Sequence, residues 1–425
     1  MPVSFKDAFK FWLKLGFINF GGPAGQIAVM HRELVDRRQW VEESVFLRAL
    51  NFCMLLPGPE AQQLATYIGL RMHGYLGGIV AGTFFVIPSI FVMLMLSWLA
   101  AAHGDAPVIA GLFYGISPVV VAIVVEAVMR IGKKSLKHNA LYGFAAVAFV
   151  AGYFFDVPFP LIVLAAAIGG LVMGAYYPGI FCIRIGGAKE CSIENTDKKT
   201  VLPPISHAIK VVLVFGILWV AVAVPLVVVF GTEHILTQIT FFFTKAAFVT
   251  FGGAYAVLSY IADYAVNISG WLTEKQMLSG LGLAESTPGP LIMVTQYVGF
   301  LGAWKLSGNA SQLWTAIAGG LLTTYCTFLP SFMFIFAGAP YIDALSGNRR
   351  VEAALTGVTA AVVGVILKLA VFFSINTFFP AKGAIDGFAI GVAGVTFLAL
   401  QRFHIPIHLV ILLGAFGGML RKLYI

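Results

Sequence analysis

Two lysines occupy matching places inside strongly apolar stretches of the chain, and an anion is the ligand that they would suit. Lys14 lies six residues before Phe20, and Lys245 lies six residues before Phe251. A lysine within a membrane segment normally faces the interior of a helix bundle or a cavity. Two such cations would suit a divalent anion. The alternative is that each lysine extends to the membrane surface, where it would have no such role.

The spacing that separates the two lysines also relates two helix-breaking motifs. The pairs are Phe20-Gly21-Gly22 with Phe251-Gly252-Gly253, Trp40 with Trp271, and Pro57-Gly58-Pro59 with Pro288-Gly289-Pro290. Proline inside a helix removes a backbone donor and clashes with the preceding turn, so Pro-Gly-Pro must interrupt a helix. In a bilayer such a break is tolerated only inside protein or beside water. Helices that restart there direct free N–H groups into the space, which is an anion-binding arrangement.

Polar side chains cluster around these breaks and differ between the two copies. Together with the lysines and the backbone of the breaks, they form the predicted substrate-binding set: Lys14, Asn19, Gly21, Gly22, Gln26, Pro57, Gly58, Gln62, Gln63, Lys245, Gly252, Gly253, Ser286, Thr287, Gly289 and Gln296. Amide and hydroxyl donors could hold the oxygens of an oxyanion. The alternative is that the amides satisfy one another across a helix pair.

Two acids lie within three residues of the Pro-Gly-Pro motifs. Glu60 follows Pro59 directly, and Glu285 lies three residues before Pro288. A carboxyl group beside an anion site in a membrane can bind and release a proton, so both residues are candidates for proton coupling. Either could instead pair with a nearby cation such as Arg48.

The composition identifies a membrane protein. Of the 425 residues, 59% are hydrophobic and 11% are charged, with a mean hydropathy of +0.91, whereas soluble domains carry about 25% charged residues. The net charge of +8 is typical of basic cytoplasmic loops. No nucleotide-binding loop, intramembrane protease motif or nucleic-acid-binding stripe is present. His404 and His408 have helical spacing without a third ligand, so we predict no metal and no cofactor.

The repeat predicts the architecture. Further matches at a slightly longer spacing, such as Pro88-Ser89 with Pro330-Ser331, extend it over the whole chain. We expect a first repeat at 1–180, a polar linker plus one connecting transmembrane helix at 181–232, and a second repeat at 233–425. If the segments 8–34 and 44–73 enter and return on one side, each copy keeps four full crossings, and the connecting helix inverts the second copy. The predicted fold is an all-α polytopic membrane protein with two inverted repeats and broken or re-entrant helices.

The motifs resemble those of the chromate ion transporter family, in its long two-repeat form. The resemblance rests on Asn19-Phe20-Gly21-Gly22-Pro23-x-x-Gln26, His31, Trp40, Leu56-Pro57-Gly58-Pro59-Glu60-x-Gln62-Gln63-Leu64, and the partner motifs Thr250-Phe251-Gly252-Gly253 and Ser286-Thr287-Pro288-Gly289-Pro290. It implies a multi-pass carrier in a prokaryotic inner membrane that expels chromate, exchanges it for protons as an antiporter and gives chromate resistance. The second copy has Ala254 in place of Pro23 and Leu291 in place of Glu60, which leaves open which copy carries coupling.

Three alternatives stay open at this stage. The chain could carry sulfate or another oxyanion, it could be an anion channel that uses the same site, or it could be a membrane enzyme that reduces chromate. The absence of a redox-cofactor motif argues against the enzyme. We expect rocking of one repeat against the other to give alternating access, and the sequence leaves open whether the chain acts alone or as a homodimer. The expected partners are a chromate- or sulfate-like dianion and the lipid bilayer, without nucleic acid.

Overall fold

A computed structural model describes residues 3–20, 22–181, 204–308, 311–342, 348–380 and 384–424. Gly21, one of the predicted site residues, and most of the predicted polar linker lie outside the described residues. Within the described ranges the secondary structure is helical and contains no β-strand. The all-α prediction is therefore confirmed for this part of the chain.

The first copy contains short helices followed by long ones. They are α1 (Phe5–Ile18), α2 (Gly22–His31), the π-helical turn η1 (Arg32–Arg37), α3 (Glu43–Leu55), α4 (Glu60–Phe84), α5 (Ile87–His103), α6 (Pro107–Ser135), α7 (Asn139–Phe154), α8 (Phe159–Tyr176) and α9 (Pro178–Phe181). The break between α3 and α4 falls at Pro-Gly-Pro, where Gly58 has a φ of 129°. Only glycine adopts such a φ easily. The interruption predicted from the prolines is therefore present.

The second copy repeats this order after the connecting helix α10 (Ile205–Phe230). It consists of α11 (Ile235–Phe248), α12 (Ala254–Ala262), η2 (Asp263–Ile268), α13 (Glu274–Ser286), η3 (Leu291–Met293), α14 (Val294–Lys305), α15 (Gln312–Gly338), η4 (Ala339–Tyr341), α17 (Arg349–Phe378), α18 (Gly387–Phe403) and α19 (Ile407–Tyr424). The turns η1 and η2 begin at positions that the repeat relates, and so do α6 and α17. The sequence repeat is thus a repeat of elements.

The first broken segments return to the end from which they start. The guanidinium of Arg38, just after η1, lies 5.0 Å from the ring centroid of Phe11 in α1. The ring of His73, halfway along α4, lies 2.9 Å from the carbonyl oxygen of Val3 at the start of the chain. At His73 and Gly74 the backbone of α4 leaves the helical conformation. The segment 8–34 therefore forms a hairpin around its break, and the segment 44–73 ends beside the start of the chain.

Seven described helices are long and apolar enough to cross a membrane, and three shorter helices are apolar as well. The long ones include α6, α10, α15 and α17. A helix needs about 20 apolar residues to span the hydrocarbon core. The elements α1, α2, α3, α12, α13 and α14 are not among the seven. The chain is therefore a multi-pass membrane protein with short broken helices between its long apolar ones.

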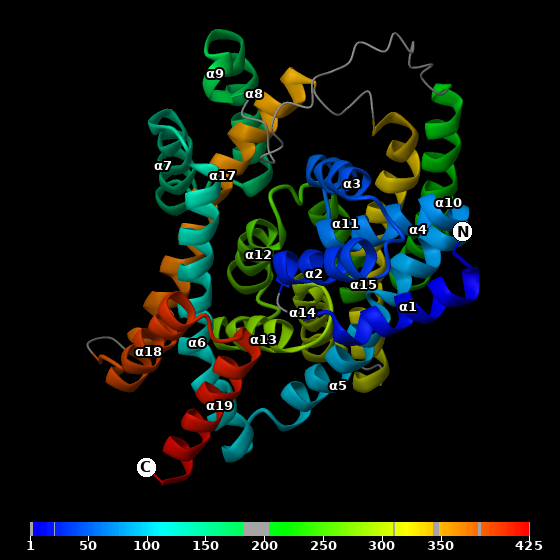
Figure 1. The fold of residues 1–425 in the computed structure, drawn as a ribbon. Coiled ribbons are helices and arrows are strands. Elements are labelled where there is room, and N and C mark those ends of the chain that lie inside the picture. The colour runs from blue at the N-terminus through cyan, green and yellow to red at the C-terminus, as the bar shows by residue number, and fades with distance from the viewer. Residues whose placement is uncertain are drawn as a thin grey trace.

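The helices form two bundles that each draw on both copies (Figure 1). The long-helix bundle consists of α6, α7, α8, α17, α18 and α19, in which α17 packs against α6, α7 and α8, and α19 packs against α6. The broken-helix bundle contains α1 to α5 and α10 to α15. The main packing between the two bundles goes through α12 and α13. The repeat boundary therefore does not coincide with the division in space.

Candidate functional site

The breaks of the two copies are joined by a reciprocal pair of main-chain hydrogen bonds. The N–H of Gly58 donates to the carbonyl oxygen of Thr250 at 2.9 Å, and the N–H of Gly289 donates to the carbonyl oxygen of Asn19 at 2.8 Å. The repeat relates the two donors to each other, and it relates the two acceptors in the same way. Contacts in which i meets j and j meets i are typical of a two-fold relation between the partners. We call this pair of bonds the interlock. It joins each Pro-Gly-Pro motif to the residue that precedes Phe251 or Phe20 in the other copy.

The amide side chains predicted to bind substrate divide into two groups. Gln26 donates to the carbonyl oxygen of Gly289 at 2.5 Å, and Gln63 donates to that of Pro57 at 2.8 Å, so these two hold the breaks. Gln62 accepts a hydrogen bond from Ser331 at 2.6 Å. Gln296 donates to the carbonyl oxygen of Ile90 and accepts from Thr324, both at 2.9 Å. Gln62 and Gln296 thus bond with hydroxyl and main-chain groups of neighbouring helices, and not with each other as the alternative proposed.

The two hydroxyl residues of the predicted set bond locally. Ser286 donates to the carbonyl oxygen of Leu283 at 3.0 Å, and Thr287 donates to that of Ala284 at 3.3 Å. Both bonds lie within the last turn of α13. They terminate the helix before its Pro-Gly-Pro break.

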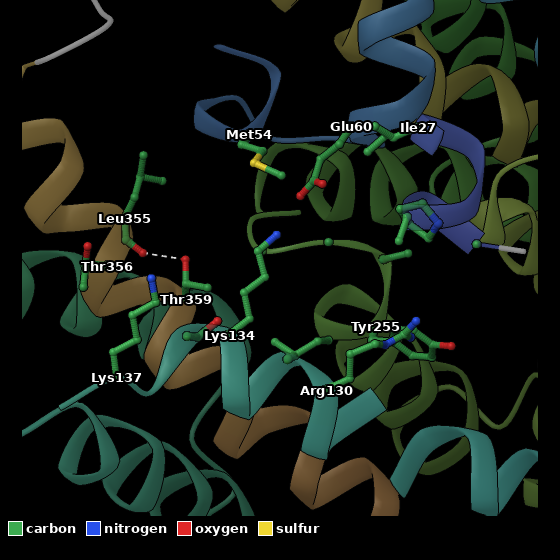
Figure 2. Close-up of a pocket in the computed structure, with 18 of the residues that line it drawn as sticks. Ile27, Met54, Glu60, Arg130, Lys134, Lys137, Tyr255, Leu355, Thr356 and Thr359 are labelled. Carbon is green, nitrogen blue, oxygen red and sulfur yellow. Dashed lines mark hydrogen bonds between the residues drawn. The ribbon is translucent and has the colours of Figure 1, made fainter. Parts of the chain in front are cut away.

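A cavity of about 310 Å³ lies between the two bundles, beside the interlock (Figure 2). The broken-helix bundle contributes the N-terminal ends of α2 and α12, with Gly22, Gly252 and Gly253 in the wall. The long-helix bundle contributes the C-terminal end of α6 and the first turns of α17. The first N–H groups of a helix have no partner within it, so the two helix starts present donors toward this space.

Both predicted coupling acids line the cavity. Glu60 stands at the first position of α4, and Glu285 stands near the end of α13. Tyr255 of α12 donates its hydroxyl to the carboxylate of Glu285. Glu60 is partly exposed, and Figure 2 shows its carboxylate directed into the open space. The prediction that these two acids lie near one site agrees with the geometry, although one copy supplies its acid after the break and the other before it.

The cations of the cavity are not the two lysines that sequence reasoning selected. Arg130, Lys134 and Lys137 of α6 and the following turn line the wall, and Figure 2 shows the Lys134 side chain extending toward the side on which Glu60 lies. Lys14 and Lys245 are exposed and do not line the cavity. Lys14 borders a separate groove with Lys10, Arg38 and other residues at the start of the chain. Substrate binding by Lys14 and Lys245 stays a prediction.

In the sequence the cavity cations form a basic cluster after a long apolar segment. A cluster at a helix end normally marks the cytoplasmic surface, so the pattern does not single out these residues as a binding site. Arg130 also forms an ion pair of 3.5 Å with Glu126 in the preceding turn. Among the described residues no group of three or more His, Cys, Asp and Glu is close enough to hold a metal ion.

A cavity between broken helices, in a multi-pass protein with an internal repeat, is typical of a membrane transporter. Residues 6–171 and 237–419 match the chromate transporter family, so the chain belongs to that family. It is 30% identical to the chromate transport protein of Pseudomonas aeruginosa over 99% of this chain and 93% of that protein.

Two further relatives are similar over most of their length. The chain is 28% identical to a probable chromate transport protein of Synechococcus elongatus, over 85% of this chain and 83% of the relative. It is also 28% identical to the chromate transport protein of Cupriavidus metallidurans, over 84% of this chain and 79% of the relative. No solved structure matches the chain significantly.

Proposed function

We propose that this protein is a secondary carrier that exports chromate across a prokaryotic inner membrane, in exchange for protons, and so gives chromate resistance. The observation that carries the proposal is the cavity between the bundles. It brings two helix starts, three cations and two carboxyl groups to one space. The family and the relatives' names support chromate as the substrate.

The charges of the cavity suit the capture of an oxyanion. Arg130, Lys134 and Lys137 are exposed side chains at one end of the cavity. A cleft with one sign of charge raises the local concentration of ions of the opposite sign. Beyond these cations, the ends of α2 and α12 offer N–H groups and the positive ends of helix dipoles. We infer that the cations attract the anion and that the helix starts orient it.

The side on which the cavity opens supports export. Lys133, Lys134 and Lys137 cluster where α6 ends, and basic loops generally face the cytoplasm. On this assignment the open cavity would take up an anion from the cytoplasm. We further propose that the two repeats are inverted, because a single helix, α10, separates them and because the interlock is reciprocal.

A comparison of the two copies supports a carrier rather than a channel. In the second copy, α13 packs against α6 and α19, and Leu278 of α13 is 1% exposed. In the first copy the equivalent helix, α3, has no comparable packing against the described helices α17 and α8, and the equivalent residue, Leu47, is 42% exposed. One end of the path is thus closed by packing that the other end lacks, whereas a conducting channel needs both ends open.

This asymmetry suggests what moves. We propose that the broken-helix bundle shifts against the long-helix bundle, so that α3 docks on α17 as α13 separates from α6. The contacts support this division because each bundle is tightly packed internally and contains elements of both copies. The motion differs from the rocking of whole repeats that the sequence suggested.

Transport measurements would test the proposal. The purified protein is reconstituted in proteoliposomes, and uptake of chromate and of sulfate is followed with and without an imposed pH gradient. We expect chromate to accumulate against its gradient when the pH gradient drives it. Equal accumulation of sulfate would favour a general oxyanion carrier. Flux that only dissipates a chromate gradient, at any pH difference, would favour a channel and overturn the proposal.

A further inference from the structure

We propose that the polar groups around Gly289 form an inner station of the transport path, and that this station holds the oxyanion in its monoprotonated form. The inference rests on the proposed function and adds the protonation state of the substrate. Three residues meet at Gly289. The main-chain carbonyl oxygen of Asn19 accepts the N–H of Gly289 at 2.8 Å, and the side-chain amide of Gln26 donates to the carbonyl oxygen of Gly289 at 2.5 Å. Ser89 Oγ lies 2.8 Å from the point where a Cβ on Gly289 would stand.

These side chains are buried and carry polar atoms without hydrogen-bond partners. Asn19 and Gln26 are 0% exposed, and Ser89 is 1% exposed. Asn19 Nδ2 and Oδ1, Gln26 Oε1 and Ser89 Oγ have no partner among the described residues. Folded proteins pair the large majority of buried polar atoms. Four such atoms on three residues that contact Gly289 therefore indicate a ligand that completes them.

The equivalent place in the other copy has fewer such atoms among the described residues, with Gln63 Oε1 beside Gly58 as one of them. Around Gly58, Ser331 occupies the position of Ser89, and its hydroxyl donates to Gln62 Oε1 at 2.6 Å. Thr250, the equivalent of Asn19, donates its hydroxyl to the carbonyl oxygen of Ala246 at 2.7 Å. Met293 stands where Gln62 does in the repeat, so the repeat supplies no amide for Ser89. Of the equivalent pairs Ser89 with Ser331 and Asn19 with Thr250, only the members beside Gly289 therefore carry side chains without partners in the described part of the chain.

The unpaired groups include donors and acceptors. Asn19 Nδ2 and the Ser89 hydroxyl can donate, whereas Asn19 Oδ1 and Gln26 Oε1 can only accept. A tetrahedral dianion has only acceptor oxygens, so two amide oxygens would face it without a proton between them. A monoprotonated oxyanion has one O–H donor and several acceptor oxygens. It can therefore bond with both kinds of group.

The charges nearby favour the same species. The acids Glu285 and Glu60, with Tyr255, line the adjacent cavity. The cations Arg130 and Lys134 belong to the cavity wall on α6, while Lys14 of α1 is exposed and lies in the separate groove. α5, which carries Ser89, has no acid, lysine or arginine. Burying one negative charge among neutral dipoles costs less than burying two.

The protonation state of the bound anion would determine selectivity between chromate and sulfate. Hydrogen chromate is a weak acid that coexists with chromate near neutral pH, whereas hydrogen sulfate is a strong acid that is absent there. A station that requires the O–H group would therefore accept chromate and reject sulfate, although the two dianions have the same shape and charge. Size is not needed for the discrimination.

The first test is the pH dependence of KM in proteoliposomes, with equal pH on both sides. Above the pKa of hydrogen chromate we expect KM for total chromate to rise about tenfold per pH unit, as the protonated fraction falls. A KM for total chromate that does not change with pH would overturn the inference, and so would effective competition by sulfate.

The second test compares two serines that the repeat relates. Ser89→Ala removes an unpaired hydroxyl, so we expect an unchanged or higher melting temperature and a KM raised about tenfold, as for the loss of one ligand hydrogen bond. Ser331→Ala removes a paired hydroxyl and should lower the melting temperature without a comparable change in KM. If Ser89→Ala keeps the wild-type KM, the station holds water only and the inference fails. Failure of the proposed function would give a different result from failure of this inference, because the wild-type protein itself would then not transport chromate.

Discussion

Gly282 of α13 lies directly against Ile116 of α6, and a Cβ on the glycine would stand 3.6 Å from the Cβ of the isoleucine. This contact joins the two bundles at the closed end of the path. The repeat relates Gly282 to Asn51 of α3, and Ile116 to Val358 of α17. Asn51 is exposed, so the equivalent contact is not made on the open side. The pair Gly282 and Ile116 therefore reports which end of the path is closed.

A disulfide between these positions should stop transport. The distance between the two Cβ positions lies within the usual range for a disulfide, about 3.5–4.5 Å. In a protein whose native cysteines are replaced, we expect the double variant Gly282→Cys, Ile116→Cys to crosslink on mild oxidation and to lose transport, and reduction should restore it. The matched variant Asn51→Cys, Val358→Cys should crosslink only while substrate is being transported. A crosslinked 282–116 protein that transports at the wild-type rate would contradict the proposed motion.

Replacing Lys134 should affect transport more than replacing Lys245. Lys134 lines the cavity, whereas Lys245 is exposed on α11. Loss of one attracting cation should lower the uptake rate at low chromate by about tenfold, with a smaller effect at high salt. We expect Lys134→Ala to show this loss and Lys134→Arg to recover part of it. Loss of transport in Lys245→Ala or Lys14→Ala, with Lys134→Ala active, would instead support the sequence-based assignment.

The two acids of the cavity should separate coupling from exchange. Glutamine keeps the shape and the hydrogen bonds of a protonated glutamate but has no proton to release. In Glu60→Gln or Glu285→Gln we expect chromate exchange to persist while the response to an imposed pH gradient disappears in at least one of the two variants. The measurement is chromate uptake with and without the gradient. Unchanged gradient dependence in both variants would remove these acids from the coupling mechanism.

Labelling from outside the cell tests the inversion of the repeats. Arg37 follows the first hairpin of the first copy, and Lys275 stands near the start of α13 in the second. Single cysteines at these positions should react differently with an impermeant thiol reagent in whole cells, with position 275 accessible and position 37 protected. Equal labelling at both positions would indicate parallel repeats.

Low pH should destabilise the end of the long-helix bundle where Asp386 forms its hydrogen bonds. Burial raises the pKa of the Asp386 carboxyl, but hydrogen bonds from Tyr114 at 2.5 Å, from the Ala389 N–H and from Arg421 at 3.3 Å outweigh it and hold the pKa below the usual 3.8. The stabilisation is therefore complete above the unfolded-state pKa and is lost as the pH falls through the folded-state pKa. Asp386→Asn should cost about 2 kcal/mol near neutral pH and little in strong acid, as measured by thermal unfolding in detergent.

The broken helices could be predicted because their cause is local. Pro-Gly-Pro interrupts a helix in any surroundings, and the repeat spacing identified both copies. The two acids could be predicted as neighbours of one site because they lie within a few residues of the breaks. The cavity cations could not be selected, since the position of Lys134 depends on how the far end of α6 is placed across the cavity from α2 and α4. That relation joins elements of two bundles, and no spacing along the chain encodes it.

Ser89 shows a second limit of sequence reasoning. It is one of two serines that follow a repeated proline, and the sequence treats Ser89 and Ser331 alike. Only the packing shows that Ser331 has an amide partner, while Ser89 has no partner in the described part of the chain. The difference arises from Met293, which lies far along the chain in a segment that pattern alone describes as apolar core.

The exchange of helices between the bundles governs how the chain must assemble in the membrane. When the first copy has been inserted, the faces of α7 and α8 that will receive α17, and the face of α6 that will receive α19, have only lipid beside them. They stay so until nearly the whole second copy has been synthesised. Insertion therefore passes through an intermediate in which both bundles are incomplete. The transport path between them is not yet enclosed by protein. A chain severed between residues 182 and 203 should accordingly become functional only when both pieces are made in the same membrane.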